Sequence, residues 1–178
     1  MNNTANKITL LRIILIPIFM VLLYLDLVYV SFTVYIIAAM SDIIDGYIAR
    51  KYDQVTDFGK FMDPLADKML VLSALCYFVE TGIVPGWLVA VVLLREFAVA
   101  GLRLLAVQQG IVIAAAPSGK AKTLVTMIAV GTFILVGESW VPFPTLLTAV
   151  CLCGILVTTV YSGFDYFYAN MSVFKNKK

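Results

Sequence analysis

The chain has 178 residues, of which 62% are hydrophobic and only 13% are charged. About a quarter of the residues in a soluble domain are charged, so this composition excludes an ordinary soluble protein and indicates a polytopic membrane protein. The formal net charge of +2 says little by itself, and we expect no nucleic-acid partner.

At about 20 residues per crossing, a chain of this length can hold six helices with short loops. Apolar runs between turn signals predict helices at about residues 8–25, 29–50, 59–79, 87–107, 119–136 and 145–168. Every lysine and arginine then falls within a helix or in a loop on one side, whereas the opposite turns hold only Asp26, Glu80 and Glu138. The positive-inside rule places that cationic side, with both termini, in the cytoplasm. The sequence therefore predicts an all-α protein of the cell membrane, with six transmembrane helices in a single domain over residues 1–178.

Four aspartates lie at the predicted cytoplasmic ends of the second and third helices. Asp42 and Asp45 are three residues apart, and Asp63 and Asp67 are four apart, so each pair shares one helix face. Ionisable groups within membrane helices are costly and usually functional. Four clustered carboxylates repel one another unless cations lie between them, and Mg²⁺ commonly bridges carboxylates to substrate phosphates. The spacing thus predicts a divalent-metal site that opens to the cytoplasm.

These aspartates belong to a longer pattern, Asp42-x-x-Asp45-Gly46-x-x-Ala49-Arg50, eight residues, then Gly59-x-x-x-Asp63-x-x-x-Asp67. The pattern resembles the signature of the CDP-alcohol phosphatidyltransferases, with every position filled and the spacing matched. The resemblance implies that an acceptor hydroxyl attacks CDP-diacylglycerol and displaces CMP, with two Mg²⁺ or Mn²⁺ ions bound. It further implies that all four aspartates bind metal, that Asp67 is also the catalytic base, and that the donor is framed by Gly46, Ala49, Arg50 and Gly59. The chain contains no histidine, so the commonest general base is absent.

A second pattern lies at the start of the first predicted helix. Asn6, Thr9 and Arg12 follow one another at intervals of three and share a helix face. The pattern resembles the start of bacterial members of the same family, which implies that these residues help to bind the donor. Arg12 lies more than one turn into the helix, where we favour a role beside the substrate headgroup over cytosolic anchoring. Family resemblance also suggests a homodimer.

Several basic residues are candidates for binding the acceptor: Lys60, Arg95, Arg103, Lys120 and Lys122. A pocket of such cations suits an acceptor that itself carries a phosphate. The segments L-R-E-F and G-K-A-K-T resemble those of bacterial family members that use glycerol 3-phosphate, so we predict this acceptor, with an inositol phosphate as the nearest alternative.

Each of these cations also has a simpler explanation. The lysines could be positive-inside anchors, and Arg95 could take part in an internal ion pair. A pair between Arg95 and Glu96 within one helix is not expected, because adjacent side chains point in different directions.

The end of the last predicted helix is rich in aromatic residues. Phe164, Tyr166, Phe167 and Tyr168 are typical of an aromatic belt at the membrane–water interface.

Two other classes of membrane protein use carboxylates in this way. Membrane prenyltransferases bind a diphosphate through aspartates and Mg²⁺, but they usually need more helices and arrange their motifs differently. A divalent-cation transporter would place its carboxylates along a path through the bilayer, whereas the four aspartates here cluster at two adjacent helix ends. Release of CMP from CDP-diacylglycerol would distinguish the transferase from both.

Overall fold

A computed structural model describes the backbone of residues 4–51, 57–111, 113–114 and 116–174, and the side chains of these ranges apart from 4–9, 42–51, 57–64, 67, 172 and 174. These residues form six α-helices and a short 3₁₀ helix, without strands. The elements are α1 (Thr4–Tyr24), α2 (Val28–Lys51), α3 (Asp57–Glu80), α4 (Gly86–Gln108), α5 (Pro117–Leu135), α6 (Pro144–Ala169) and η1 (Met171–Phe174). The all-α prediction is confirmed, and each predicted helix lies within a few residues of an observed one.

Turn chemistry explains where the helices stop and start. Between α1 and α2, Asp26 has a φ of 53°, a left-handed conformation that aspartate tolerates better than most side chains. Between α3 and α4, Gly82 has a φ of 78°, which glycine adopts without a steric penalty. Pro117 and Pro144 begin α5 and α6, where the missing amide hydrogen would have no partner within the helix. These turns fix the helix order of an up-and-down bundle.

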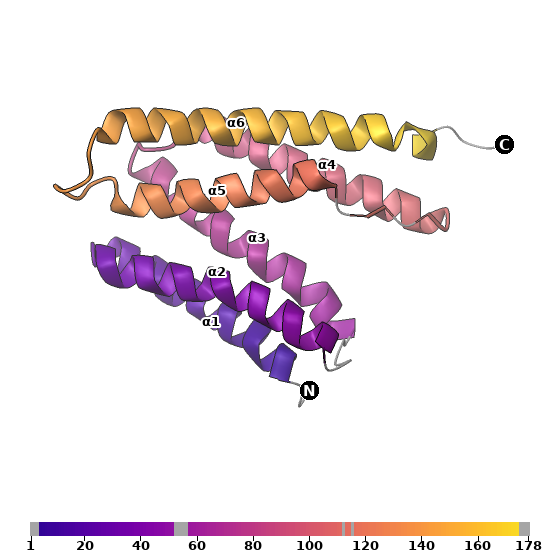
Figure 1. Cartoon of the computed structure of the whole chain (residues 1–178), viewed down its shortest axis with the longest axis horizontal. Helices are drawn as coiled ribbons and strands as arrows, with labels where there is room; N and C mark the ends of the chain where they lie inside the picture. The colour runs from indigo at the N-terminus through magenta and orange to yellow at the C-terminus, as the bar shows by residue number, and fades with distance from the viewer. Residues whose placement is uncertain (1–3, 52–56, 112, 115, 175–178) are drawn as a thin grey trace.

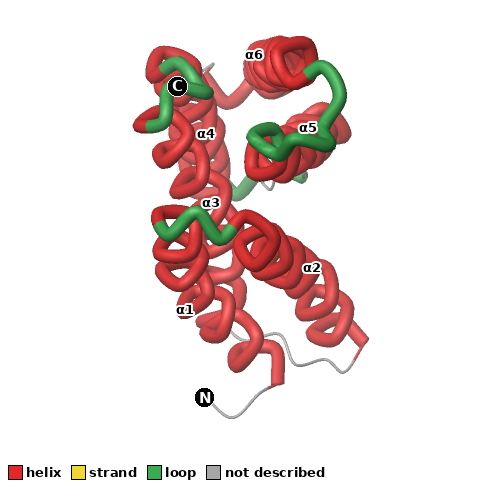
Figure 2. Tube along the Cα trace, turned by 90° about the vertical axis from the view of Figure 1, so that its left-hand side faces the viewer, coloured by secondary structure: helices red, strands yellow, loops and turns green. Residues whose placement is uncertain are grey.

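The helices form two groups that α3 joins. Helices α1 and α2 pack against each other and against α3, while α6 packs against α4 and α5. Figure 1 shows α3 crossing between the two groups, and Figure 2 shows them end on. Helix α5 also contacts α2 and α3, so the groups share one interior.

Aromatic side chains from four helices fill that shared interior. Phe19 of α1, Tyr35 of α2, Phe78 of α3 and Phe133 of α5 are each at most 2% exposed. The Phe78 and Phe133 rings meet edge to face with centroids 5.5 Å apart, and the Tyr35 hydroxyl donates to the Met127 carbonyl at 2.9 Å. Burial of such large rings contributes strongly to packing, and the hydroxyl is satisfied as buried polar groups must be.

Two of the helices could cross a membrane on length and composition alone. Among the described residues these are α5 and α6, while the apolar segments Leu10–Tyr24 of α1 and Val28–Ser41 of α2 are shorter. Two such helices are weak evidence, since the core helix of a soluble protein can pass the same test. The six predicted crossings therefore stay a prediction.

The two halves of the aspartate motif lie on neighbouring helix ends. Asp42 and Asp45 fall in the last turns of α2, and Asp63 and Asp67 in the first half of α3. The two helices contact each other, and these ends lie on the same side of the bundle as the N-terminus (Figure 1). The fold thus brings both halves of the motif to one end of the molecule.

Candidate functional site

The side chains of most motif residues lie outside those that the structure describes. This applies to the predicted metal ligands Asp42, Asp45, Asp63 and Asp67, to Lys60, and to the predicted donor-binding residues Asn6, Thr9, Gly46, Ala49, Arg50 and Gly59. The structure describes the backbone of the helices that carry the aspartates. Because their side chains are not described, the geometry predicted for the metal site stays a prediction.

Among the predicted donor-binding residues, Arg12 has a described side chain. It is 1% exposed, and its Nε donates a hydrogen bond to Ser41 Oγ at 3.1 Å. Ser41 immediately precedes Asp42 in α2, so the guanidinium lies at the level of the first motif aspartate. A buried arginine at this point requires anionic or polar partners, which agrees with a role near the site rather than with cytosolic anchoring.

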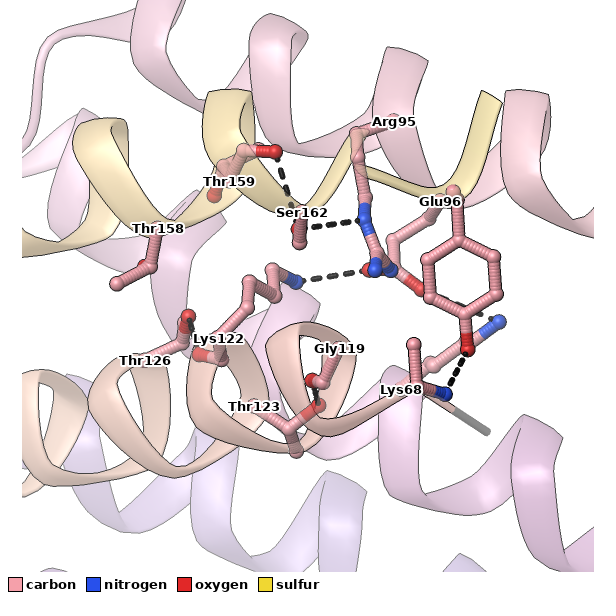
Figure 3. Close-up of polar contacts among 12 residues, drawn as sticks. Lys68, Arg95, Glu96, Gly119, Lys122, Thr123, Thr126, Thr158, Thr159 and Ser162 are labelled. Carbon is pink, nitrogen blue, oxygen red and sulfur yellow. Dashed lines mark hydrogen bonds and ion pairs between the residues drawn. The ribbon is translucent and has the colours of Figure 1, made fainter. Parts of the chain in front are cut away.

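A second polar centre surrounds the Glu96 carboxylate, next to the motif. Lys122 Nζ of α5 lies 2.8 Å from Glu96 Oε1, Arg95 Nη1 lies 2.9 Å from the same oxygen, and Lys68 Nζ of α3 lies 3.2 Å from Oε2. We call Lys68, Arg95, Glu96 and Lys122 the Glu96 cluster (Figure 3). Lys68 directly follows Asp67, so the Glu96 cluster adjoins the last motif aspartate.

The contact between Arg95 and Glu96 corrects a prediction. Adjacent helical side chains leave the backbone in different directions, so this pair was not expected. Both side chains are long, however, and their charged ends turn back to meet at 2.9 Å because the other two cations hold the carboxylate at this place. The ion-pair explanation for Arg95 is confirmed, and the same contacts bring Arg95 together with Lys122 as the basic-pocket hypothesis required.

Arg95 is oriented by a second contact. Its Nε donates to Ser162 Oγ of α6 at 3.0 Å, and Ser162 is fully buried. The remaining terminal nitrogen, Nη2, is buried and has no hydrogen-bond partner among the described residues. The guanidinium is thus fixed on two sides and keeps donors available on the third.

Tyr166 connects the Glu96 cluster to Arg103. The Tyr166 hydroxyl accepts a hydrogen bond from Arg103 Nη2 at 2.7 Å and another from the Ala116 amide at 2.9 Å. The guanidinium carbons of Arg95 and Arg103 lie 5.4 and 5.3 Å from the centre of its ring, within cation–π range. Tyr166 is 3% exposed, so its assignment to an interfacial aromatic belt is wrong. Phe164 and Tyr168 are largely exposed, as that prediction requires.

The N-terminal turn of α5 approaches this centre closely. A Cβ on Gly119 would lie 3.1 Å from the Tyr166 ring and 3.2 Å from Arg95 Nη2, so a side chain here would crowd both. Ser118 donates a short hydrogen bond to Asp165 of α6. Lys120 is exposed, and no contact from its side chain to the Glu96 cluster is present in the described part of the chain. The structure therefore separates the two predicted lysines, with Lys122 inside the cluster and Lys120 outside it.

A small cavity of about 50 Å³ opens beside Lys68 and Lys122. It is lined by Lys68, Glu96, Lys122, Thr123, Thr126 and three apolar residues, Val71, Leu72 and Val92. This volume holds a few water molecules or one polar group rather than a whole lipid headgroup.

The family model for CDP-alcohol phosphatidyltransferases matches residues 2–164. The chain belongs to the CDP-alcohol phosphatidyltransferase family. Its similarity to three bacterial proteins, all named CDP-diacylglycerol–glycerol-3-phosphate 3-phosphatidyltransferase, extends over most of its length. The protein of Bacillus subtilis is 42% identical over 98% of both chains. The protein of Rickettsia typhi is 32% identical over 98% of this chain and 100% of its own. The protein of Salmonella paratyphi A is 36% identical over 79% of this chain and 81% of its own.

Four residues of the site in this CDP-alcohol phosphatidyltransferase were not predicted from the sequence to belong to it: Lys68, Glu96, Ser162 and Tyr166. Lys68 directly follows the last motif aspartate, which is a usable signal for proximity to the site. Thr159, Ser162 and Tyr166 are spaced three and four residues apart, so they form a polar stripe along one face of an apolar helix. Polar stripes on membrane helices usually face the bundle interior.

Proposed function

We propose that this chain transfers the phosphatidyl group of CDP-diacylglycerol to glycerol 3-phosphate and releases CMP. The observation that carries the proposal is the near full-length similarity to proteins with this name, at up to 42% identity. The Glu96 cluster supports it independently, because three cations, two of them largely buried, converge next to the last motif aspartate. A phosphorylated acceptor is the ligand that such cations suit.

The reaction needs one bond made, one bond broken and one proton removed. The acceptor hydroxyl oxygen attacks the phosphorus that carries diacylglycerol, and the bond from that phosphorus to the CMP oxygen breaks, with the electron pair leaving on CMP. Asp67 takes the hydroxyl proton in this proposal. Phosphoryl-group transfer is catalysed mainly by positioning and electrostatic stabilisation, so few other groups need to move protons.

The four motif aspartates would hold two divalent ions, magnesium or manganese. Carboxylate oxygens are the ligands that these hard ions prefer, and the two pairs are carried by neighbouring ends of packed helices. When bound, the ions would neutralise the donor pyrophosphate and the charge that develops on the leaving oxygen. Arg12, Asn6 and Thr9 on α1 and Arg50 on α2 would contact the rest of the donor headgroup.

The acceptor phosphate would bind to the cations of the Glu96 cluster, with Arg103 close by through Tyr166. Because Lys120 is exposed, we expect it to contribute less than Lys122. Lys60 stays a candidate on its sequence position alone. An inositol phosphate would use the same cations, so the acceptor must be decided by assay.

We also propose that six helices cross the cell membrane, with both termini and the site on the cytoplasmic side. Besides the distribution of charges, large apolar side chains are exposed along the helices, among them Ile14 and Ile18 of α1 and Leu94 and Phe97 of α4. Exposed apolar surface of this extent favours contact with lipid or with a partner subunit. A homodimer belongs to the same proposal and is supported by family resemblance alone.

The test is an acceptor panel with purified protein in mixed micelles containing CDP-diacylglycerol. CMP release is measured with glycerol 3-phosphate, inositol phosphate, inositol, serine and glycerol, each with and without Mg²⁺. We expect release with glycerol 3-phosphate and Mg²⁺ only. If CMP release is fastest with inositol phosphate, the chain catalyses the same reaction with that acceptor. CMP release with none of the acceptors would favour another class of protein, such as a cation transporter.

A further inference from the structure

Among the described side chains, Glu96 is the anion that joins the three buried or half-buried cations of the Glu96 cluster. Its side chain is 12% exposed, those of Arg95 and Lys122 are 11% and 7%, and that of Lys68 is 41%. The contacts bring together α3, α4 and α5, and Ser162 adds α6 through Arg95 (Figure 3). A single carboxylate therefore fixes where three positive charges from three helices meet.

The charges within the cluster do not balance. Three cations face one carboxylate, which leaves two positive charges among the described side chains of the cluster. Like charges held together away from water repel one another strongly. A phosphate monoester carries about −1.5 to −2 at neutral pH, so a single phosphate group would restore the balance.

The donors of the cluster are also incompletely used. Arg95 Nη2 is buried without a hydrogen-bond partner among the described residues. Each lysine ammonium has three donors, and the contacts of Lys68 and Lys122 with Glu96 account for one each. The carboxylate can therefore stay in place while the cations gain a second anion.

We propose that Glu96 is a positioning residue of the acceptor pocket, which holds Lys68, Arg95 and Lys122 in the convergent arrangement that a dianionic phosphate requires. Glu96 does not touch the substrate; it acts through the three cations. The identity of the acceptor rests on the proposed function, whereas the binding of a phosphate group rests on the geometry of the Glu96 cluster.

Replacing Glu96 with glutamine removes the charge and keeps the size. The glutamine amide presents two donors to groups that can only donate, so at most one side of the cluster keeps an acceptor. Repulsion among the cations is then relieved by movement of Lys68, the most exposed of the three, toward solvent. The convergent arrangement is lost, and so are charge-assisted contacts to the phosphate.

The experiment compares Glu96→Gln, Glu96→Asp and a matched control, Glu138→Gln. Glu138 lies at the opposite end of the bundle, where it accepts a hydrogen bond from Tyr29 at 2.8 Å, and belongs to neither site. The KM for glycerol 3-phosphate is measured at saturating CDP-diacylglycerol, and the reverse, after size-exclusion and thermal-unfolding checks of folding.

We expect Glu96→Gln to raise the KM for glycerol 3-phosphate about ten- to a hundredfold, the worth of a charge-assisted contact, with the KM for CDP-diacylglycerol changed less than about threefold. Glu96→Asp keeps the charge and should recover part of the loss, and Glu138→Gln should match the unaltered protein. If Glu96→Gln does not fold, the same selective rise, smaller in size, is expected for Glu96→Asp. An equal change for both substrates, no change, or a fall in the KM for glycerol 3-phosphate would overturn the proposal.

A second measurement keeps this inference separate from the proposed function. Inorganic phosphate should raise the unfolding temperature of the unaltered protein, and Glu96→Gln should need about ten times more phosphate for the same rise. If glycerol 3-phosphate supports no CMP release but this difference is present, the proposed function fails and the role of Glu96 stands. Equal phosphate dependence, or none in the unaltered protein, overturns the role of Glu96.

Discussion

Lys122 provides the sharpest test of the acceptor pocket, because its neighbour Lys120 supplies a matched control. The change is Lys122→Met, which keeps an unbranched side chain of similar length and removes the ammonium group. Lys122 Nζ lies 2.8 Å from Glu96 Oε1, and the side chain is 7% exposed. Lys120 is exposed on the same turn, so Lys120→Met removes the same charge without touching the cluster.

The magnitude follows from the contacts that are lost and kept. A charge-assisted hydrogen bond to the acceptor phosphate is worth about 1.5–3 kcal/mol, so the KM for glycerol 3-phosphate should rise about ten- to a hundredfold. The free energy of unfolding should change only moderately. Glu96 keeps Arg95 at 2.9 Å and Lys68 at 3.2 Å, and the cost of burying an ammonium group is recovered. We therefore expect the free energy of unfolding to change by less than about 2 kcal/mol.

The assay is a titration of each substrate at saturation of the other, with CMP as the measured product. The KM for CDP-diacylglycerol should stay within about threefold in both variants, since the donor is bound by the motif helices. Similar KM values for glycerol 3-phosphate in Lys122→Met and Lys120→Met would show that the buried and the exposed lysine contribute equally, and that Lys122 does not bind the acceptor phosphate.

Asp42→Asn should abolish turnover in a folded protein and weaken Mg²⁺ binding; full activity in excess chelator would contradict the metal site. Asp67→Asn should keep donor binding within about threefold but stop transfer to the hydroxyl, measured by binding of a CDP-diacylglycerol analogue beside turnover. Tyr166→Phe should lower the free energy of unfolding by about 1–3 kcal/mol, since two hydrogen bonds are lost while the ring contacts stay. Tyr161→Phe is the control, because Tyr161 is 65% exposed. An equal loss of unfolding free energy in both variants would show that the two hydrogen bonds to the Tyr166 hydroxyl do not stabilise the protein. Single cysteines within residues 51–58, where α2 leads into α3, should be labelled only from the cytosolic side in a chain whose three native cysteines are replaced; labelling from outside would reverse the orientation.

The fold was predictable because its signals are local. Apolar run length and turn residues such as Gly82 and Pro144 fixed six helices to within a few residues, and the spacing of the aspartates placed both pairs on neighbouring helix ends. Charge on an apolar helix also identified Arg95 and Lys122 as site candidates. These features depend on residues close together in the chain.

The interior of the site was less predictable because it depends on packing between distant segments. Arg95 meets Ser162 across 67 residues, and Lys122 meets Glu96 across 26. The face of α6 that points into the bundle determines that Tyr166 is buried, whereas Phe164 and Tyr168 are exposed. The pairing of Arg95 with Glu96 was wrongly dismissed on backbone direction alone, since the length of both side chains and two further cations determined it.

Transfer to glycerol 3-phosphate can be tested by following labelled atoms from the acceptor into the lipid. Purified protein is incubated with CDP-diacylglycerol, Mg²⁺ and ¹³C-labelled glycerol 3-phosphate, and the lipids and nucleotides are measured by mass spectrometry. We expect phosphatidylglycerol phosphate that carries the labelled glycerol, formed in equal amount with CMP. CMP without labelled lipid, or a labelled lipid that still forms when all four motif aspartates are replaced by asparagine, would contradict it.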